Sequence, residues 1–209
     1  MQIKRLIPLP GAWAAQIALF LVALAVSTSA LAGSCDDYAA QLSQMSAADQ
    51  AIRSVAPHQF SVRFGTAWEV IDTQNLKRFR VLLDRCGWPV ESRYGRDASN
   101  AAWLLVQHAD SDRAFQRRAL RILEQAVLAR EAVPGNLAYL SDRLAVADGK
   151  PQPYGTQFKV ENCQLVLAPI ESREAVNRRR SAIAGMSTLE AYEAQAQETF
   201  AKSPCEVGK

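Results

Sequence analysis

Residues 98–109 constrain the fold more than any other segment, because in helical form this segment is apolar on almost every side. From Ala101 to Val106 a helix has no polar face to present to water. The small side chains of Ala98, Ala101 and Ala102 allow a neighbouring element to approach closely. A surface helix carries a polar face, so we expect a buried helix at this position.

Apolar side chains recur at helical spacing over most of the remaining chain, which indicates further helices. Residues 57–70 alternate in polarity and contain Gly65, so a loop or a short extended piece is expected there. Two short strands flank a turn at 161–163 and predict a β-hairpin near 156–167. The sequence therefore predicts a mainly α, single helical domain of six or seven helices with one small β-hairpin. The expected helices lie at about 36–55, 73–86, 98–109, 113–126, 134–148 and 172–184, with a last one opening near 187.

The N-terminus has the pattern of a secretory signal peptide. Lys4 and Arg5 form a positive start, residues 17–26 are apolar, and small residues ending at Ala32 match the cleavage pattern. The apolar core of roughly 10 residues is about half of what spans a bilayer. We expect cleavage after about Ala32 to leave a periplasmic or secreted domain, 33–209, with no membrane span.

Charge argues against one class of partner. Removing residues 1–32 takes Lys4 and Arg5 from the 24 basic residues and none of the 21 acidic ones, which leaves a net charge of +1. Binding to nucleic acid depends on neutralising phosphates with an excess of basic side chains. We therefore expect no nucleic acid partner, and a small molecule or a cell-envelope protein instead.

Four cysteines follow the cleavage point, and an exported chain meets oxidising conditions that favour disulfides. Three pairings are open, and the sequential pairs Cys35–Cys86 and Cys163–Cys205 are favoured because both tie an end of the chain to its body. No C-x-x-C motif indicates a redox or zinc site. Lipidation at Cys35 is a lesser alternative, since residues 32–34 fit the lipid-attachment pattern poorly.

His108 is the leading catalytic candidate. On a helix it lies three positions after Leu105 and four after Leu104, so it points along buried surface. Its imidazole would serve as a general acid or base, with Asp110 or another carboxylate fixing the tautomer. The alternative is a structural histidine in the core, bonded to a backbone carbonyl or to Asp142.

A metal site is not expected here. Apart from His108 the chain has only His58 as a second histidine, and the segment 110–112 lacks the glycine and distal glutamate of a calcium loop. Asp110 and Asp112 are better read as helix caps. We expect no metal and no cofactor.

A second polar group follows in the sequence. Arg143 presents a guanidinium that can hold a carboxylate or phosphate, and Asp142 lies beside it. Tyr154, Thr156 and Gln157 follow a proline-rich loop that limits backbone freedom, which suits preorganised hydrogen bonding to a ligand. These five residues are the ligand-binding candidates. The alternatives are a structural ion pair for Arg143 and a latch that holds the hairpin on the helices.

Four motifs carry a resemblance to a known family: 87–89 (GWP), 106–110 (VQHAD), 137–143 (LAYLSDR) and 154–157 (YGTQ). With these motifs the chain resembles a bacterial family of uncharacterised proteins, a domain of unknown function, over about residues 70–195. The resemblance implies no activity, cofactor or substrate. It does nominate the polar residues of these motifs as the set to test.

Three functions are consistent with this set of polar residues. The favoured one is an exported helical module that binds a ligand or an envelope partner through the region of His108 and Tyr154. A purely structural envelope protein is a third possibility. A site of either kind predicts that His108, Arg143, Tyr154 and Gln157 converge on one open cavity.

The alternative function is a metal-independent periplasmic enzyme, such as a hydrolase. His108 would act as general acid or base, with Asp110 or Asp142 orienting it. Arg143 or Gln157 would hold the substrate. Loss of a pH-dependent activity on substitution of His108 would distinguish this enzyme from the module.

Overall fold

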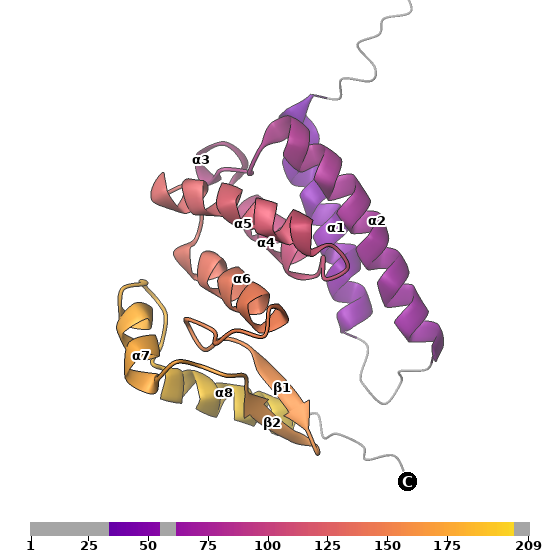
Figure 1. Ribbon diagram of the computed structural model, residues 1–209. Coiled ribbons are helices and arrows are strands. Elements are labelled where there is room, and N and C mark those ends of the chain that lie inside the picture. The colour runs from indigo at the N-terminus through magenta and orange to yellow at the C-terminus, as the bar shows by residue number, and fades with distance from the viewer. Residues whose placement is uncertain (1–33, 55–61, 203–209) are drawn as a thin grey trace, which may run out of the picture. The chain divides into compact units, whose positions relative to one another are not determined.

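The computed structural model describes residues 34–54 and 62–202. Over these residues the chain forms eight α-helices, a short 3-10 helix and a two-stranded antiparallel sheet (Figure 1). The mainly α class with one hairpin is confirmed, and the four-residue α3 is the helix beyond those expected. The elements are the 3-10 helix Cys35–Asp37, α1 Tyr38–Arg53, α2 Val62–Cys86, α3 Glu91–Tyr94, α4 Arg96–Gln107, α5 Arg113–Leu128, α6 Pro134–Ala147, β1 Phe158–Glu161, β2 Gln164–Leu167, α7 Arg173–Ser181 and α8 Leu189–Ala201.

Helix α4 lies in the core, as its sequence predicts. It packs against α1, α2, α3, α5 and α6. Ala102 and Val106 are fully buried, and Ala98 and Leu105 are nearly so. The small alanine side chains suit this helix to several close neighbours. Because α4 is enclosed, its C-terminal end is held in place from several sides, and His108 is the residue that follows this end.

Helices α1 and α2 run side by side and carry one wall of the site described below (Figure 1). The buried stripe of α1 begins with Tyr38, Leu42 and Met45 at helical spacing. A disulfide joins Cys35 to Cys86, so the start of α1 is tied to the end of α2, as expected.

The expectation of a loop over 57–70 is wrong from Val62 onward, because α2 begins there. The helix expected to open at 73 therefore begins eleven residues earlier, and Asp72 lies inside it. Gly65, one ground for expecting a loop, lies inside α2, because a single glycine costs a helix only about 1 kcal/mol. Further along the helix lies Asn75, a buried polar residue. Its Nδ2 donates to the main-chain oxygen of Met45 at 3.3 Å, which fastens α2 to α1.

The C-terminal part consists of the hairpin and the last two helices. Strands β1 and β2 pair antiparallel, with Phe158 opposite Leu167. The segment before β1 is fastened to the one after β2, because Gln152 donates from its backbone nitrogen to Pro169 oxygen at 2.8 Å. The side-chain nitrogen of Gln152, fully buried, also donates to the oxygens of Gln157 and Ala168 at 2.9 Å each.

Several expectations concern residues that the structure does not describe. Residues 1–32, the expected signal peptide, lie outside the described residues. Cys163 is disulfide-bonded, and Cys205, its expected partner, also lies outside them. Within the described ranges, none of the helices has both the length and the apolar character needed to cross a membrane.

Candidate functional site

His108 lies at the C-terminal end of α4 and faces a carboxylate from another helix. Its backbone nitrogen donates to Leu104 oxygen at 3.2 Å, which fixes the residue on the last turn. Its Nδ1 lies 2.7 Å from Oδ1 of Asp49 in α1, 59 positions earlier in the chain. An ionised carboxylate only accepts, so the neutral ring donates from Nδ1 and keeps the lone pair on Nε2. The partner of His108 is therefore Asp49, and neither Asp110 nor Asp142 takes that place.

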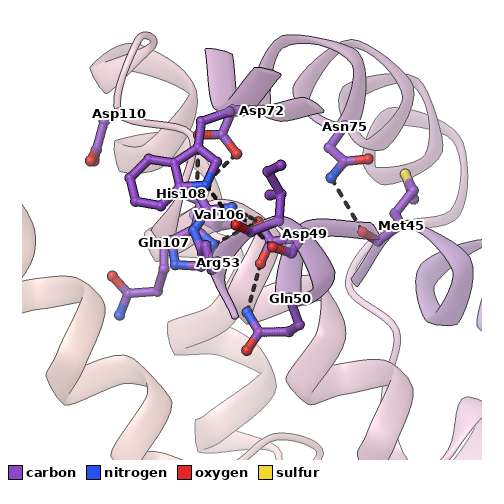
Figure 2. Close-up of polar contacts among 12 residues, drawn as sticks. Met45, Asp49, Gln50, Arg53, Asp72, Asn75, Val106, Gln107, His108 and Asp110 are labelled. Atoms are coloured by element: carbon purple, nitrogen blue, oxygen red, sulfur yellow. Dashed lines mark hydrogen bonds and ion pairs between the residues drawn. The ribbon is translucent and has the colours of Figure 1, made fainter. Parts of the chain in front are cut away.

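Asp49 is a buried carboxylate held by three donors, whereas the His108 side chain stays 20% exposed. Gln50 Nε2 donates to its Oδ2 at 2.7 Å, and Arg53 Nη1 donates to its Oδ1 at 2.6 Å (Figure 2). Burial by itself would raise the pKa of Asp49. The bonds from His108 and Gln50 and the charge of Arg53 outweigh burial and lower this pKa below its ordinary value. Asp49 is therefore a stable anion behind the imidazole.

Arg53 extends this network to α2. Its Nη2 donates to both carboxylate oxygens of Asp72, at 2.9 Å each. Its guanidinium carbon also lies 5.5 Å from the centre of the Trp68 ring. One arginine thus links the Asp49–His108 pair to a second carboxylate and an aromatic side chain. Figure 2 shows these polar groups gathered beside α1 and α2.

Asp110 and Arg143 form the opposite part of the site. Arg143 donates from Nε to Oδ1 of Asp110 at 2.9 Å and from Nη2 to Oδ2. Arg113 and Gln116 donate to the same Oδ1 at 2.9 and 3.1 Å. Burial opposes ionisation, but the bond and charge of Arg143 dominate and the pKa of Asp110 is lowered. The structural ion pair that the sequence offered as the alternative for Arg143 is therefore present, with Asp110 as the partner.

A pocket of about 420 Å³ joins these groups. Its charged lining consists of two guanidinium groups and three carboxylates, beside the imidazole of His108. Across residues 34–54 and 62–202, no three His, Cys, Asp or Glu side chains are grouped so that they could hold a metal ion. We call this cavity the His108 pocket, and its lining residues are Arg53, Trp68, Glu69, Asp72, Thr73, His108, Asp110, Ser111 and Arg143.

The other four candidates lie apart from this pocket. Asp142 is fully buried and accepts hydrogen bonds from the backbone nitrogens of Tyr154 and Thr156, both at 2.8 Å. Burial raises the pKa of Asp142, and the two backbone bonds oppose that rise without cancelling it. Gln157 donates from Nε2 to Thr156 Oγ1 at 2.9 Å. These contacts hold the 154–157 segment against α6, which is the geometry of the predicted latch. The candidates therefore do not converge on one cavity. His108, Asp110 and Arg143 line the His108 pocket, and the remaining four candidates lie elsewhere.

Sequence reasoning missed Asp49, Arg53 and Asp72. A signal for Asp49 was present, since it continues the helical spacing of Leu42 and Met45 and places an acid on a buried stripe. A buried carboxylate needs hydrogen-bonding partners, so an acid at such a position predicts a polar network around it. No comparable signal marks Asp72. Its position depends on residues 62–70 being helical, and the sequence predicted a loop there.

Comparison with known proteins identifies a family but no characterised relative. No curated protein and no solved structure matches the chain. The model of a family of unknown function, DUF6624, matches residues 36–202, a wider range than the 70–195 over which the motifs carry the resemblance. Since this match covers most of the sequence, the chain belongs to the DUF6624 family of unknown function.

Proposed function

We propose that this protein is an exported domain that binds a small polar molecule in the His108 pocket. The observation that supports the proposal most directly is the pocket itself, about 420 Å³ in volume and lined by His108 and Asp110 from the connection between α4 and α5 and by Arg143 from α6. This volume lies within the range of small-molecule sites. Export is supported by the signal-like N-terminus and by the Cys35–Cys86 disulfide, since oxidising compartments favour such bonds.

The charge of the lining indicates the class of ligand. Arg53 already bonds Asp49 and Asp72, and Arg143 already bonds Asp110, so each guanidinium has its counter-charge inside the protein. A strongly anionic ligand would have to compete with these carboxylates. A neutral or zwitterionic molecule, such as a sugar or a dipeptide, meets both donors and acceptors without that competition.

The experiment is a fragment screen by NMR, with fragments grouped as neutral, zwitterionic, dianionic and dicationic. We expect hits from the neutral and zwitterionic groups that shift the imidazole signals of His108. Thr73→Trp, which places an indole at the pocket lining, should abolish these shifts. Gln74→Trp is the matched control, because Gln74 is exposed on the same helix but does not line the pocket. Hits confined to the charged groups, or shifts that survive in Thr73→Trp, would contradict the proposal.

A second candidate function is metal-independent hydrolysis, and the 2.7 Å contact between Asp49 and His108 favours it. A carboxylate that accepts from Nδ1 orients the ring and leaves Nε2 basic, which is the arrangement of a general base. Nε2 would take a proton from water as the water adds to the carbonyl carbon of an ester and the C=O π pair moves to oxygen. Asp49 would stabilise the imidazolium that results. The ester C–O bond would then break as that proton passes from Nε2 to the leaving alcohol oxygen.

The substitution His108→Asn tests this second function. The asparagine amide can still donate toward Asp49 but provides no base at the position of Nε2. With a small ester such as p-nitrophenyl acetate, we expect turnover to decrease by roughly 10²- to 10⁴-fold while the folded state is retained. If the unmodified protein binds fragments but shows no turnover, hydrolysis is refuted and only the binding function remains.

A further inference from the structure

A second and larger cavity, about 810 Å³ in volume, lies among α6, β2, α8 and the connection between α7 and α8. None of the seven candidate residues named from the sequence lines it. Its volume is also within the range of ligand sites. We call it the α8 cavity. The residues that matter for the argument are Tyr139, Leu165, Arg180, Ser187, Tyr192 and Phe200.

Arg180 places a buried positive charge at this cavity. The residue lies on the last turn of α7 and is only 2% exposed. Its Nε donates to Ser187 oxygen at 2.6 Å and its Nη1 to Tyr154 oxygen at 2.8 Å, while Nη2 lies 3.5 Å from Ser187 Oγ. All these acceptors are neutral. Among the described residues, no carboxylate lies within ion-pair distance of Arg180.

Nearby acids offset this charge only from a distance. Asp142 and Glu190 both act on Arg180 electrostatically, and neither forms an ion pair with it. Burial lowers the pKa of Arg180 in spite of them. A buried charge is costly unless it is paired, so a bound anion would stabilise this site.

The remaining walls of the cavity are mainly apolar or aromatic. The rings of Tyr139 and Tyr192 meet edge to face with 6.1 Å between their centres, and the guanidinium carbon of Arg180 lies 4.9 Å from the centre of the Tyr192 ring. Leu165 from β2 and Phe200 from α8 add hydrocarbon surface. A ligand here would therefore meet a cation at one point and apolar surface over the rest of its length.

We propose that the α8 cavity binds a small amphipathic monocarboxylate, with its carboxylate at Arg180 and Ser187 and its hydrocarbon body against Tyr139, Leu165 and Phe200. The single unpaired guanidinium favours one negative charge, and it can donate to a carboxylate from N–H groups that the three contacts above leave available. The apolar walls favour a hydrocarbon chain over a sugar or a nucleotide. This site is independent of the His108 pocket.

The probe for the headgroup is a set of three ten-carbon compounds: decanoate, decanol and decyltrimethylammonium. Each is titrated into the full chain and followed by calorimetry and by NMR signals of Tyr139 and Tyr192. We expect decanoate to bind roughly tenfold or more tightly than decanol, because of charge-assisted hydrogen bonds, and the cation to bind most weakly. Equal affinities for all three, or no binding of decanoate, would overturn the proposal.

The location is tested by a matched pair of variants on α8. Ala196 lines the cavity, whereas Ala194 is exposed on the same helix and does not. Ala196→Trp should weaken decanoate binding at least tenfold, and Ala194→Trp should leave it unchanged. Decanoate affinity that is the same in both variants would place binding elsewhere and refute the site.

Two further variants test charge and independence. Arg180→Met should remove the preference for decanoate over decanol. If this variant does not fold, the Ala196 and Ala194 pair still decides the matter. His108→Asn should bind decanoate normally, so failure of the His108 pocket proposal and failure of this one are separate results.

Discussion

Replacing Gly155 with alanine tests whether the 154–157 segment is held by close packing against the last two helices. Gly155 has φ = +67°, a conformation that side chains with a Cβ rarely adopt. A Cβ built at this position would lie 2.6 Å from Leu189 Cδ1 and 3.3 Å from Val176 Cγ1. Both neighbours are fully buried, so neither can move aside freely. The substitution therefore combines backbone strain with overpacking.

The two contributions have separable magnitudes. An alanine forced into the left-handed region costs about 1–2 kcal/mol. Overpacking a buried site costs typically about 1–3 kcal/mol more. Gly149 provides the control, since its φ is +69° and a Cβ there would meet nothing within 4 Å. Gly149→Ala should therefore show only the first contribution, and Gly155→Ala should show both.

The assay is equilibrium unfolding in urea of both variants and the unmodified chain. We expect Gly155→Ala to lower the free energy of unfolding by about 2–5 kcal/mol, and by at least about 1 kcal/mol more than Gly149→Ala. Unchanged m-values would show that the comparison concerns stability alone. Equal losses in the two variants would refute the claim that Leu189 and Val176 confine this segment.

Two other perturbations address the disulfide between α1 and α2 and the ion pair in the His108 pocket. Replacing both Cys35 and Cys86 with serine opens a loop of 51 residues, and unfolding in urea should show a loss of about 4 kcal/mol on the chain-entropy estimate; a loss below about 1 kcal/mol would contradict it. Because the pKa of Asp110 is lowered in the folded state, its bond with Arg143 stabilises the fold above the ordinary pKa of an aspartate and is lost as the pH decreases through the lowered value. The Asp110→Asn variant should therefore lose less stability on acidification than the unmodified chain, and identical acid limbs in the two stability profiles would count against this assignment.

Helix α4 and the start of α2 show which parts of the fold the sequence could predict. Residues 101–106 are apolar on every side of a helix, so burial is the arrangement that suits them, and the structure confirms it. The start of α2 was missed because residues 57–70 alternate in polarity and contain Gly65, which favours a loop over a helix. A short alternation and one glycine do not exclude a helix, because tertiary packing outweighs such local preferences.

The residues of the candidate site, too, were predictable only in part. His108, Asp110 and Arg143 were identified because each polar group lies beside an apolar run, and these three line one pocket. The partner of His108 could not be identified, because Asp49 is 59 residues away and no local spacing relates two helices that meet only in the folded chain. Arg180 stands in a run of three arginines, 178–180, yet its side chain is buried. The three arginines at 178–180 look alike in sequence, and only packing distinguishes them.

The bond from Asn75 to Met45 has a consequence for genetics. Asn75 lines neither cavity, but it fastens α2, which carries Asp72, to α1, which carries Asp49 and Arg53. A substitution there would disturb the distances among all three charged side chains at once. In a screen for loss of the proposed ligand binding, Asn75 would therefore score together with the residues of the pocket. A parallel measurement of protein abundance would separate the two classes, because damage at Asn75 lowers the amount of folded protein and damage at His108 does not.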